Sequence, residues 1–320
     1  MGVATPVAKP RSRPLYSVVV PVYYNEPSLP ELFIKLQWLE GELNKRDMDL
    51  ELIFVDDGSG DNSYAELLKI REHRQNTKII KLTRNFGAVA ASKRGMSYAT
   101  GDCLSLLAAD LQDPVEKLLE MVDHWKNGCK FVICVRASRD DPVVSRVFSA
   151  MYYRLLNLII SSNYPHMGFD MMLLDASMLP FLAQSSKNIS MQFYAYWLGY
   201  TPKIITYERP ARPYGKSRWS FFKKFNLIVD TFTGFSVIPI RIISGIGFLV
   251  AALSLMFGIK ILVSALTGQL DVPGYASIVT IISFLLGIVL VMLGIIGEYL
   301  WRIFDNISGK PESVVEEADL

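Results

Sequence analysis

Acids, amides and arginines follow several short apolar runs in the first half of the chain. The polar segments are Pro21–Glu26, Asp56–Ser59, Thr83–Gly87, Ala109–Pro114, and Arg136 with Arg139. Carboxylates and amides can bind ribose hydroxyls or the polar edge of a base, whereas guanidinium groups match the geometry of phosphate. One such segment alone would be an ordinary turn or helix start. Their repetition favours a nucleotide-binding site over chance turns.

The elements that position these segments alternate along the chain. Predicted strands are Ser17–Val22, Leu50–Asp56, Lys78–Leu82, Cys103–Leu107 and Phe131–Val135. Predicted amphipathic helices between them are Ser28–Lys45, Asn62–Arg74, Ala88–Ala99 and Pro114–Lys126. This alternation predicts an α/β fold with a mostly parallel sheet and helices on both faces. Such sheets bind ligands beyond the carboxyl ends of their strands, where all the polar segments would meet.

Two common nucleotide-binding motifs do not match. The sequence has no Walker A motif, which argues against a P-loop NTPase. The nearest dinucleotide fingerprint, residues 58–63, lacks the third glycine and follows two aspartates that would repel a pyrophosphate. Those aspartates, Asp56 and Asp57, are better suited to hydrogen-bond a base or a ribose. The pattern therefore disfavours a redox dinucleotide fold.

Asp110 and Gln112 are candidate metal ligands. They lie two residues apart, so in an extended segment both side chains would point to the same side. Hard oxygen ligands at a strand end suit Mg²⁺ or Mn²⁺ held partly by a diphosphate. Such an ion would neutralise charge on a leaving diphosphate. Arg84 and Arg136 could assist at the same phosphates.

The composition divides the chain into a soluble part and an apolar part. Overall 51% of residues are hydrophobic and 20% are charged, but residues 235–301 carry only Arg241, Lys260, Asp271 and Glu298. Two uncharged runs, 242–259 and 272–297, are long enough to span a hydrocarbon core of about 30 Å. The connector lacks Lys and Arg, whereas basic residues flank the pair. The positive-inside rule predicts a hairpin in the cell membrane with both termini cytoplasmic.

The remaining charges and cysteines narrow the class of protein further. A net charge of +2 argues against a nucleic-acid-binding surface. The three cysteines have no metal-ligand spacing, which predicts reduced thiols in a cytosolic domain.

The predicted organisation is a polar tail at 1–15, a cytosolic domain at 16–218, a juxtamembrane amphipathic helix at 219–238, transmembrane helices at 239–267 and 274–301, and a cytosolic tail at 302–320. A second basic amphipathic stretch, 143–160, would lie at the membrane surface or pack on the domain.

The order of the polar segments resembles a known family. The runs VPVYYNE, VDDGSGD, RNFG and AADLQDP together resemble glycosyltransferase family two, which has the GT-A fold. The later segments Gly168–Met171, Tyr207–Arg209 and Tyr214–Arg218, with the C-terminal hairpin, resemble the polyisoprenyl-phosphate glycosyltransferases. Within that group the chain is similar to the bactoprenol glucosyltransferase branch, and dolichol-phosphate mannose synthase is a related enzyme.

The resemblance implies an activity and a role for each matching residue. A nucleotide sugar, UDP-glucose by branch, would give its sugar to a polyisoprenyl phosphate with inversion at the anomeric carbon. Asp110 and Gln112 would hold the metal, and Asp170 would lie near the acceptor as an orienting group or a general base. The implied nucleoside-binding residues are Pro21, Tyr23, Glu26 and Asp56, with Asp57 near them, and Arg84 and Arg136 join the donor site by their guanidinium chemistry. The implied acceptor-phosphate residues are Arg209, Lys216, Ser217 and Arg218.

Two departures from the family pattern bear on these roles. Ala108 occupies the first acidic position of the metal motif found in many relatives, so one ligand is lost. Asp113 is a possible substitute or an N-cap of the following helix. Tyr24 is an additional tyrosine that competes with Tyr23 for the same role.

Other functions remain open at this point. Transfer from GDP-mannose, as in dolichol-phosphate mannose synthase, requires the same residue types. A processive polysaccharide synthase shares the cytosolic fold but usually has more spans and a Gln-x-x-Arg-Trp motif, of which only Arg218-Trp219 matches. A membrane-anchored nucleotide-binding protein without turnover, or an assembly protein, is also compatible. Small residues in the second span, Gly287, Gly294 and Gly297, would suit helix packing in a homo-oligomer.

Overall fold

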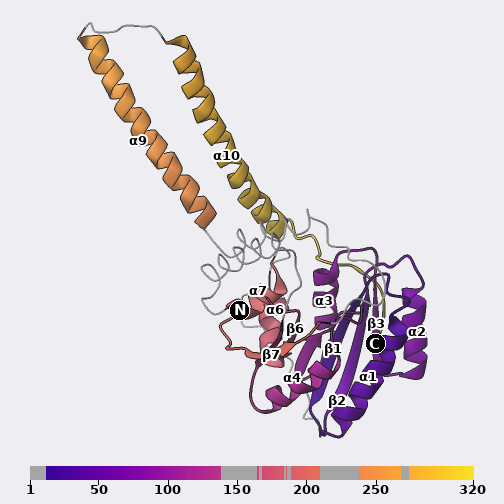
Figure 1. Cartoon of the computed structure of the whole chain (residues 1–320). Coiled ribbons are helices and arrows are strands. Elements are labelled where there is room, and N and C mark those ends of the chain that lie inside the picture. The colour runs from indigo at the N-terminus through magenta and orange to yellow at the C-terminus, as the bar shows by residue number, and fades with distance from the viewer. Residues whose placement is uncertain are drawn as a thin grey trace. The chain divides into compact units, whose positions relative to one another are not determined.

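The computed structural model of the chain (Figure 1) describes residues 12–137, 164–165, 168–183, 185, 189–209, 238–267 and 274–320. The chain divides into two compact units. The sheet unit comprises Met1–Ile228 together with Pro311–Leu320, and the helical unit comprises Val229–Lys310. The end of the chain therefore belongs to the same unit as its beginning.

The sheet unit is built on one eight-stranded sheet. Its strands are β1 (Leu15–Val22), β2 (Asp49–Asp56), β3 (Thr77–Leu82), β4 (Cys103–Leu106), β5 (Phe131–Arg136), β6 (Met171–Asp175), β7 (Lys203–Tyr207) and β8 (Val315–Asp319). Their order is β7-β5-β6-β4-β1-β2-β3-β8. The pairs β4–β1, β1–β2, β2–β3 and β5–β7 are parallel, whereas β6 and β8 run antiparallel to their neighbours. The predicted mostly parallel α/β sheet is confirmed, and its five predicted strands are β1 to β5.

Helices cover both faces of this sheet. α1 (Leu29–Asn44), α2 (Ser63–His73) and α4 (Glu116–Lys126) pack on one face, and α3 (Ala88–Met96) contacts β1 and β2. Side chains alternate between the faces, so Val18 of β1 belongs to the core under α1 whereas Val19 meets α3. Gly95 permits this close approach, because a Cβ there would lie 2.4 Å from Val19 Cγ1 and 2.9 Å from Val55 Cγ2. Both faces of the central strands are therefore buried, which explains their near-continuous apolar sequences.

The direction of β6 brings a distant segment to the carboxyl edge of the sheet. β5 and β6 are antiparallel, with Cys134 opposite Met171, so β6 begins beside the end of β5. β7 ends at the same edge, because Arg136 pairs with Tyr207 in a parallel register. The residue before β6 and the residues after β5 and β7 consequently meet, although up to about seventy positions separate them in the sequence.

The C-terminal segment forms part of the sheet, whereas the sequence analysis placed only a tail there. β8 pairs antiparallel with the edge strand β3, with Ile80 opposite Ala318 and Lys81 opposite Glu317. Arg71 of α2 forms an ion pair with Asp319, 2.7 Å between Nη2 and Oδ1. β8 thus covers the edge of β3, whose backbone groups would otherwise face solvent.

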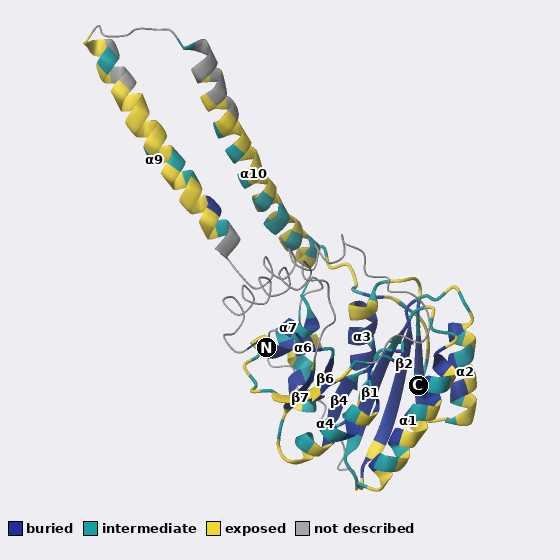
Figure 2. Cartoon of the chain, viewed as in Figure 1, coloured by how far each residue is buried: buried dark blue, intermediate teal, exposed yellow. Residues whose placement is uncertain are grey.

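The helical unit contains two long helices, α9 (Ile238–Leu266) and α10 (Tyr275–Ile307). Their most apolar parts, Ile240–Lys260 and Phe284–Ile307, have mean hydropathies of 2.3 and 2.1. Only 6% and 0% of these segments are buried inside the protein, and Figure 2 shows exposed residues along both helices. By length and composition each helix could cross a membrane.

Several predicted segments lie outside the described residues. They are the amphipathic stretch 143–160, residues 219–237 of the juxtamembrane helix, and the hairpin connector 268–273. The acceptor residues Lys216, Ser217 and Arg218 also lie there.

Candidate active site

Asp56 ends β2 with a buried and only partly satisfied carboxylate. Its side chain is fully buried, and its Oδ2 accepts a hydrogen bond of 3.3 Å from the Ser59 amide. Among the described residues, its Oδ1 is buried without a hydrogen-bond partner. Burial raises the pKa of Asp56, although the hydrogen bonds from Ser59 oppose the rise. A buried acceptor that lacks a donor at a strand end is suited to a ligand hydroxyl or N–H group.

Asp57 joins the loop after β2 to the loop after β3. Its Oδ1 and Oδ2 accept hydrogen bonds from the amides of Phe86, 2.7 Å, and Gly87, 2.9 Å. Gly58 has φ +66°, and a Cβ there would lie 2.5 Å from the Arg84 carbonyl carbon. The two loops therefore interlock through backbone contacts. Asp57 braces the loop that carries Arg84, a contact which the sequence pattern did not indicate.

The loop after β1 packs against the same region. Tyr24 adopts φ +54°, and its amide donates to Ser59 Oγ at 3.1 Å. The Tyr23 and Tyr24 rings lie edge to face with centroids 4.7 Å apart. Glu26 accepts from the amide and the side chain of Asn62, at 3.1 and 3.0 Å, at the start of α2. Pro21 lies at the end of β1 and Tyr23 begins its loop, so all the predicted nucleoside residues lie at the ends of β1 and β2 or on the loops after them.

Arg84 lies on the loop after β3, whereas Arg136 ends β5 and Arg209 follows β7. The Arg84 guanidinium carbon stands 4.2 Å from the centre of the Phe86 ring, and its Nη1 donates to the Asn85 carbonyl at 3.2 Å. Both contacts are to residues of the same loop, so the Arg84 side chain folds back over the loop after β3. We refer to the loops after β1, β2 and β3, together with the strand-end residues Pro21 and Asp56, as the donor loops.

Asp110 and Gln112 lie in a tight turn, and the predicted extended geometry is wrong. Leu111 adopts φ +61°, and Asp110 Oδ1 accepts from the Gln112 amide at 3.2 Å. An Asp side chain that bonds the backbone two residues on forms such a turn. In the part of the chain that the structure describes, no group of three or more His, Cys, Asp or Glu side chains could hold a metal ion. The oxygen donors of Asp110 and Gln112 nevertheless fit a hard divalent ion that takes its other ligands from a diphosphate.

Among the described residues beyond β4, Asp113 is the most buried acid, with 7% of its surface exposed. Its Oδ1 lies 3.7 Å from Arg209 Nη2 and has no hydrogen-bond partner among the described residues. Burial raises its pKa to about 6, against the opposing charge of Arg209. The N-cap interpretation of Asp113 is wrong, because α4 begins at Glu116 with Val115 at the N-cap.

Asp170 is the centre of a charged cluster at the carboxyl edge. Arg136 binds it in a bidentate manner, with Nε 2.6 Å from Oδ2 and Nη2 2.8 Å from Oδ1. The Tyr207 hydroxyl donates to Oδ2 at 2.8 Å, and Arg209 Nη1 donates to Oδ1 at 3.4 Å. Burial alone would raise the pKa of Asp170, but Arg136, Arg209 and Tyr207 outweigh it and lower the pKa. Asp170 is therefore an ionised carboxylate with both oxygens engaged.

Most of the predicted residues that the structure describes fall into two groups, and Asp110 and Gln112 lie in the separate turn beyond β4. The donor loops carry Pro21, Tyr23, Glu26, Asp56, Asp57 and Arg84. The second group, here called the Asp170 cluster, comprises Asp113, Arg136, Asp170, Tyr207 and Arg209. Arg136 was predicted on the donor side but pairs with Asp170. Tyr207 was not predicted as a site residue, although it belongs to the segment Tyr207–Arg209 that carries the family resemblance and follows the β-branched run 204–206.

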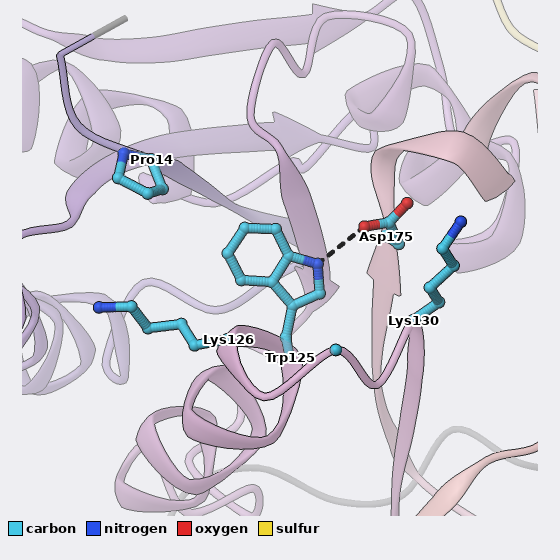
Figure 3. Close-up of a pocket in the computed structure, with 6 residues that line it drawn as sticks. Pro14, Trp125, Lys126, Lys130 and Asp175 are labelled. Atoms are coloured by element: carbon cyan, nitrogen blue, oxygen red, sulfur yellow. Dashed lines mark hydrogen bonds between the residues drawn. The ribbon is translucent and has the colours of Figure 1, made fainter.

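A pocket of about 380 Å³ lies at the opposite edge of the sheet (Figure 3). It is lined by Pro14, which precedes β1, and by Gly128 and Lys130, which precede β5. The Trp125 indole N–H donates to Asp175 Oδ2 at 2.9 Å and ties α4 to the end of β6. The pocket is thus remote from the donor loops and the Asp170 cluster.

Comparison with known proteins identifies the family. Residues 17–180, more than half of the chain, match the model of glycosyl transferase family 2. The chain belongs to glycosyl transferase family 2. An uncharacterized glycosyltransferase of Synechocystis sp. is 32% identical over 94% of this chain and 94% of its own length. The bactoprenol glucosyl transferase of Shigella phage SfII is 28% identical over 94% of this chain and 97% of its own length.

Solved structures similar to this glycosyltransferase include a mannosyltransferase from Pyrobaculum calidifontis in complex with GDP-Man and Mn²⁺. It is 18% identical with a TM-score of 0.45, and the match covers 63% of this chain and 59% of that one.

Proposed function

We propose that this glycosyltransferase transfers a single glucose from UDP-glucose to a polyisoprenyl phosphate at the cytosolic face of a membrane. Relatives named bactoprenol glucosyl transferases align with almost the whole chain, including the apolar helices. A lipid acceptor explains why a nucleotide-sugar enzyme would carry a membrane anchor. The proposal does not require a homo-oligomer, which stays a prediction.

The membrane arrangement follows from the charges around α9 and α10. Arg241 lies near the start of α9, and Arg302 and Lys310 lie near and beyond the end of α10. If both helices cross the membrane, the positive-inside rule places these residues and both termini in the cytoplasm. The donor loops and the Asp170 cluster would then have access to cytosolic nucleotide sugars.

The reaction is a single displacement at the anomeric carbon of the donor sugar. An oxygen of the acceptor phosphate forms a bond to C1 while the bond from C1 to the β-phosphate oxygen breaks. The electron pair of that bond leaves with the nucleoside diphosphate, and the configuration at C1 inverts. A phosphomonoester has a second pKa near 6, so it is largely dianionic at neutral pH. Such a nucleophile carries no proton that an enzyme base must remove.

The observation that carries the proposal is the full engagement of Asp170. Two arginines and a tyrosine hydroxyl occupy both of its oxygens, and its pKa is lowered. A carboxylate in this state is a poor proton acceptor but a rigid anchor. We assign Asp170 the role of holding Arg136 and Arg209 at the carboxyl edge, where their remaining N–H groups can bind the acceptor phosphate.

The donor would lie across the loops after β1 and β2. Asp56 Oδ1, buried and lacking a protein donor among the described residues, would accept from the base or the ribose. Pro21, Tyr23 and Glu26 would line the nucleoside site. Asp110 and Gln112 would hold a divalent ion, which would supply positive charge against the leaving diphosphate. Asp57 would act indirectly, by holding the loop after β3 through its bonds to the Phe86 and Gly87 amides.

A donor screen tests the proposal. The full chain, purified in detergent or vesicles, is incubated with polyprenyl phosphate and with labelled UDP-glucose, UDP-galactose or GDP-mannose in separate reactions. We expect one lipid-linked sugar, formed best from UDP-glucose and lost on addition of EDTA. Product from GDP-mannose alone would reassign the donor. A polymer would support a polysaccharide synthase, and the absence of any product would support a binding protein.

A further inference from the structure

The last ten residues, Pro311–Leu320, form a segment that we call the C-terminal strap. Only residues 308–310 separate it from the end of α10. Its distal part, β8, pairs with β3 and is fastened by the ion pair between Arg71 and Asp319. Its proximal part, residues 312–314, precedes β8 and contacts the loop after β3 and helix α3. The strap therefore does more than cover the edge of the sheet.

One proximal contact reaches the loop that carries Arg84. The Thr83 amide donates to the Val314 carbonyl at 3.0 Å, directly after β3 ends. Three and four residues later, the Phe86 and Gly87 amides donate to Asp57. The loop 83–87 is thus held at its start by the strap and at its end by the loop after β2. A short loop with both ends anchored has few alternative conformations.

The other proximal contacts hold α3, which begins directly after this loop. Lys93 Nζ lies 3.1 Å from Glu312 Oε1, and the Lys93 side chain is only 7% exposed. Arg94 donates through Nη2 to the Ser313 carbonyl at 2.7 Å and through Nε to Ser313 Oγ at 3.0 Å. Ser313 is 3% exposed, so these bonds are shielded from water. Charged hydrogen bonds in such surroundings are strong and directional.

We propose that the C-terminal strap is a positioning element of the donor site, with Glu312 and Ser313 as its positioning residues. The strap fixes the start of loop 83–87 and, through Lys93 and Arg94, the last turn of α3, and Asp57 fixes the end of the loop. Loss of the proximal contacts lets the loop leave Asp57 and Gly58, which lowers affinity for the nucleotide. This proposal rests on the proposed donor site for its effect on nucleotide binding, whereas the effect on the loop stands independently of it.

The test compares two acids of the same strap. Glu312→Ala removes the proximal ion pair, and Asp319→Asn removes the distal one at the far end of β8. Hydrogen exchange of the Phe86 and Gly87 amides is measured in the full chain, together with UDP affinity and the thermal midpoint. We expect Glu312→Ala to speed exchange of both amides and to weaken UDP binding about tenfold, as coupling between separate sites commonly does. Asp319→Asn should leave both at the wild-type level.

Two further variants keep the test decisive. Glu312→Gln retains the side-chain shape without the charge and replaces the alanine variant if that variant fails to fold. Glu312→Asp retains the charge and should restore UDP affinity to within about threefold of wild type. The proximal and distal variants could instead change amide exchange and UDP affinity alike, each in proportion to its loss of thermal stability. That result would mean that the strap only stabilises the sheet, and it would overturn the proposal. Unchanged exchange at Phe86 and Gly87 would overturn it as well.

Failure of the proposed transferase function can be distinguished from failure of the strap proposal. If the wild-type chain transfers no sugar or binds no UDP, the exchange comparison still decides whether the strap positions loop 83–87. If transfer occurs but the variants exchange alike, only the strap proposal fails.

Discussion

The donor loops and the Asp170 cluster lie at the same edge of one sheet but are built differently. The donor loops are held by backbone contacts, as in the bonds from Phe86 and Gly87 to Asp57, and they leave an acidic oxygen of Asp56 for a ligand. The Asp170 cluster is held by ion pairs between side chains from separate strands. The difference indicates that the first region offers a fixed backbone frame with an open acceptor, while the second holds guanidinium groups in place through a shared carboxylate.

The largest expected effect concerns the residue between the two regions. Asp110→Ala should reduce sugar transfer at least about a thousandfold, because a metal-bound diphosphate would lose its only carboxylate ligand in the 110–112 turn. Transfer is measured with saturating donor and acceptor, and Mn²⁺ binding is measured separately. Asp123→Ala, which removes a surface partner of Arg46, is the control for folding. Near-full activity of Asp110→Ala would remove Asp110 from the metal site.

The next effect separates the two regions directly. Asp170→Asn should lower kcat about a hundredfold and change UDP affinity less than twofold, because a neutral amide cannot hold two guanidinium groups. Asp175→Asn is the matched control, since Asp175 ends the same strand at the opposite edge and contacts Trp125. Steady-state kinetics and calorimetry measure the two quantities. A variant with normal turnover would exclude Asp170 from the site.

A smaller effect is expected on the donor side. Asp57→Ala should weaken UDP binding about tenfold with little change in kcat at saturating donor, because loop 83–87 loses both of its bonds to Asp57. Asp49→Ala is the control, since Asp49 begins the same strand at the other edge and pairs with Arg13. A fall in kcat with unchanged affinity would reverse the assignment of the two regions.

The smallest effect is a pH dependence of stability. The pKa of Asp170 is lowered in the folded protein, so its contribution to stability is fully present above the unfolded pKa of about 3.9 and is lost as the pH falls through the folded value. The difference in thermal midpoint between wild type and Asp170→Asn should be constant from about pH 8 to pH 5 and should shrink below pH 4. A difference that shrinks near pH 6 would indicate a raised pKa and revive the general-base role.

Much of the fold could be predicted because its central strands are buried on both faces. β1 to β5 and α1 to α4 occur within a few residues of their predicted bounds, since apolar runs and amphipathic segments alternate clearly. β6 was not predicted because Met171-Met172-Leu173-Leu174 contains no β-branched residue, and its strand form depends on pairing with β4 and β5. β8 contains three acids, which are compatible with a strand only because basic residues of β3 and α2 face them.

The same limit applies to the site. Residues directly after predicted strands could be placed at one edge, and Asp56 and Asp57 lie there. The pairing of Arg136 with Asp170 could not be predicted, because it depends on β6 entering the sheet in the antiparallel direction between β4 and β5. The turn at Asp110–Gln112 depends on a left-handed leucine, Leu111, for which the residue type is no guide.

The chemical structure of the lipid product decides whether this glycosyltransferase transfers a single sugar to a polyisoprenyl phosphate with inversion. Lipid extracted after incubation of the wild-type chain with UDP-glucose and polyprenyl phosphate is analysed by mass spectrometry and by proton NMR of the anomeric position. We expect one hexose per lipid phosphate, with the anomeric configuration opposite to that of the donor. Retention of the donor configuration, more than one sugar per lipid, or unmodified lipid would contradict the proposed function.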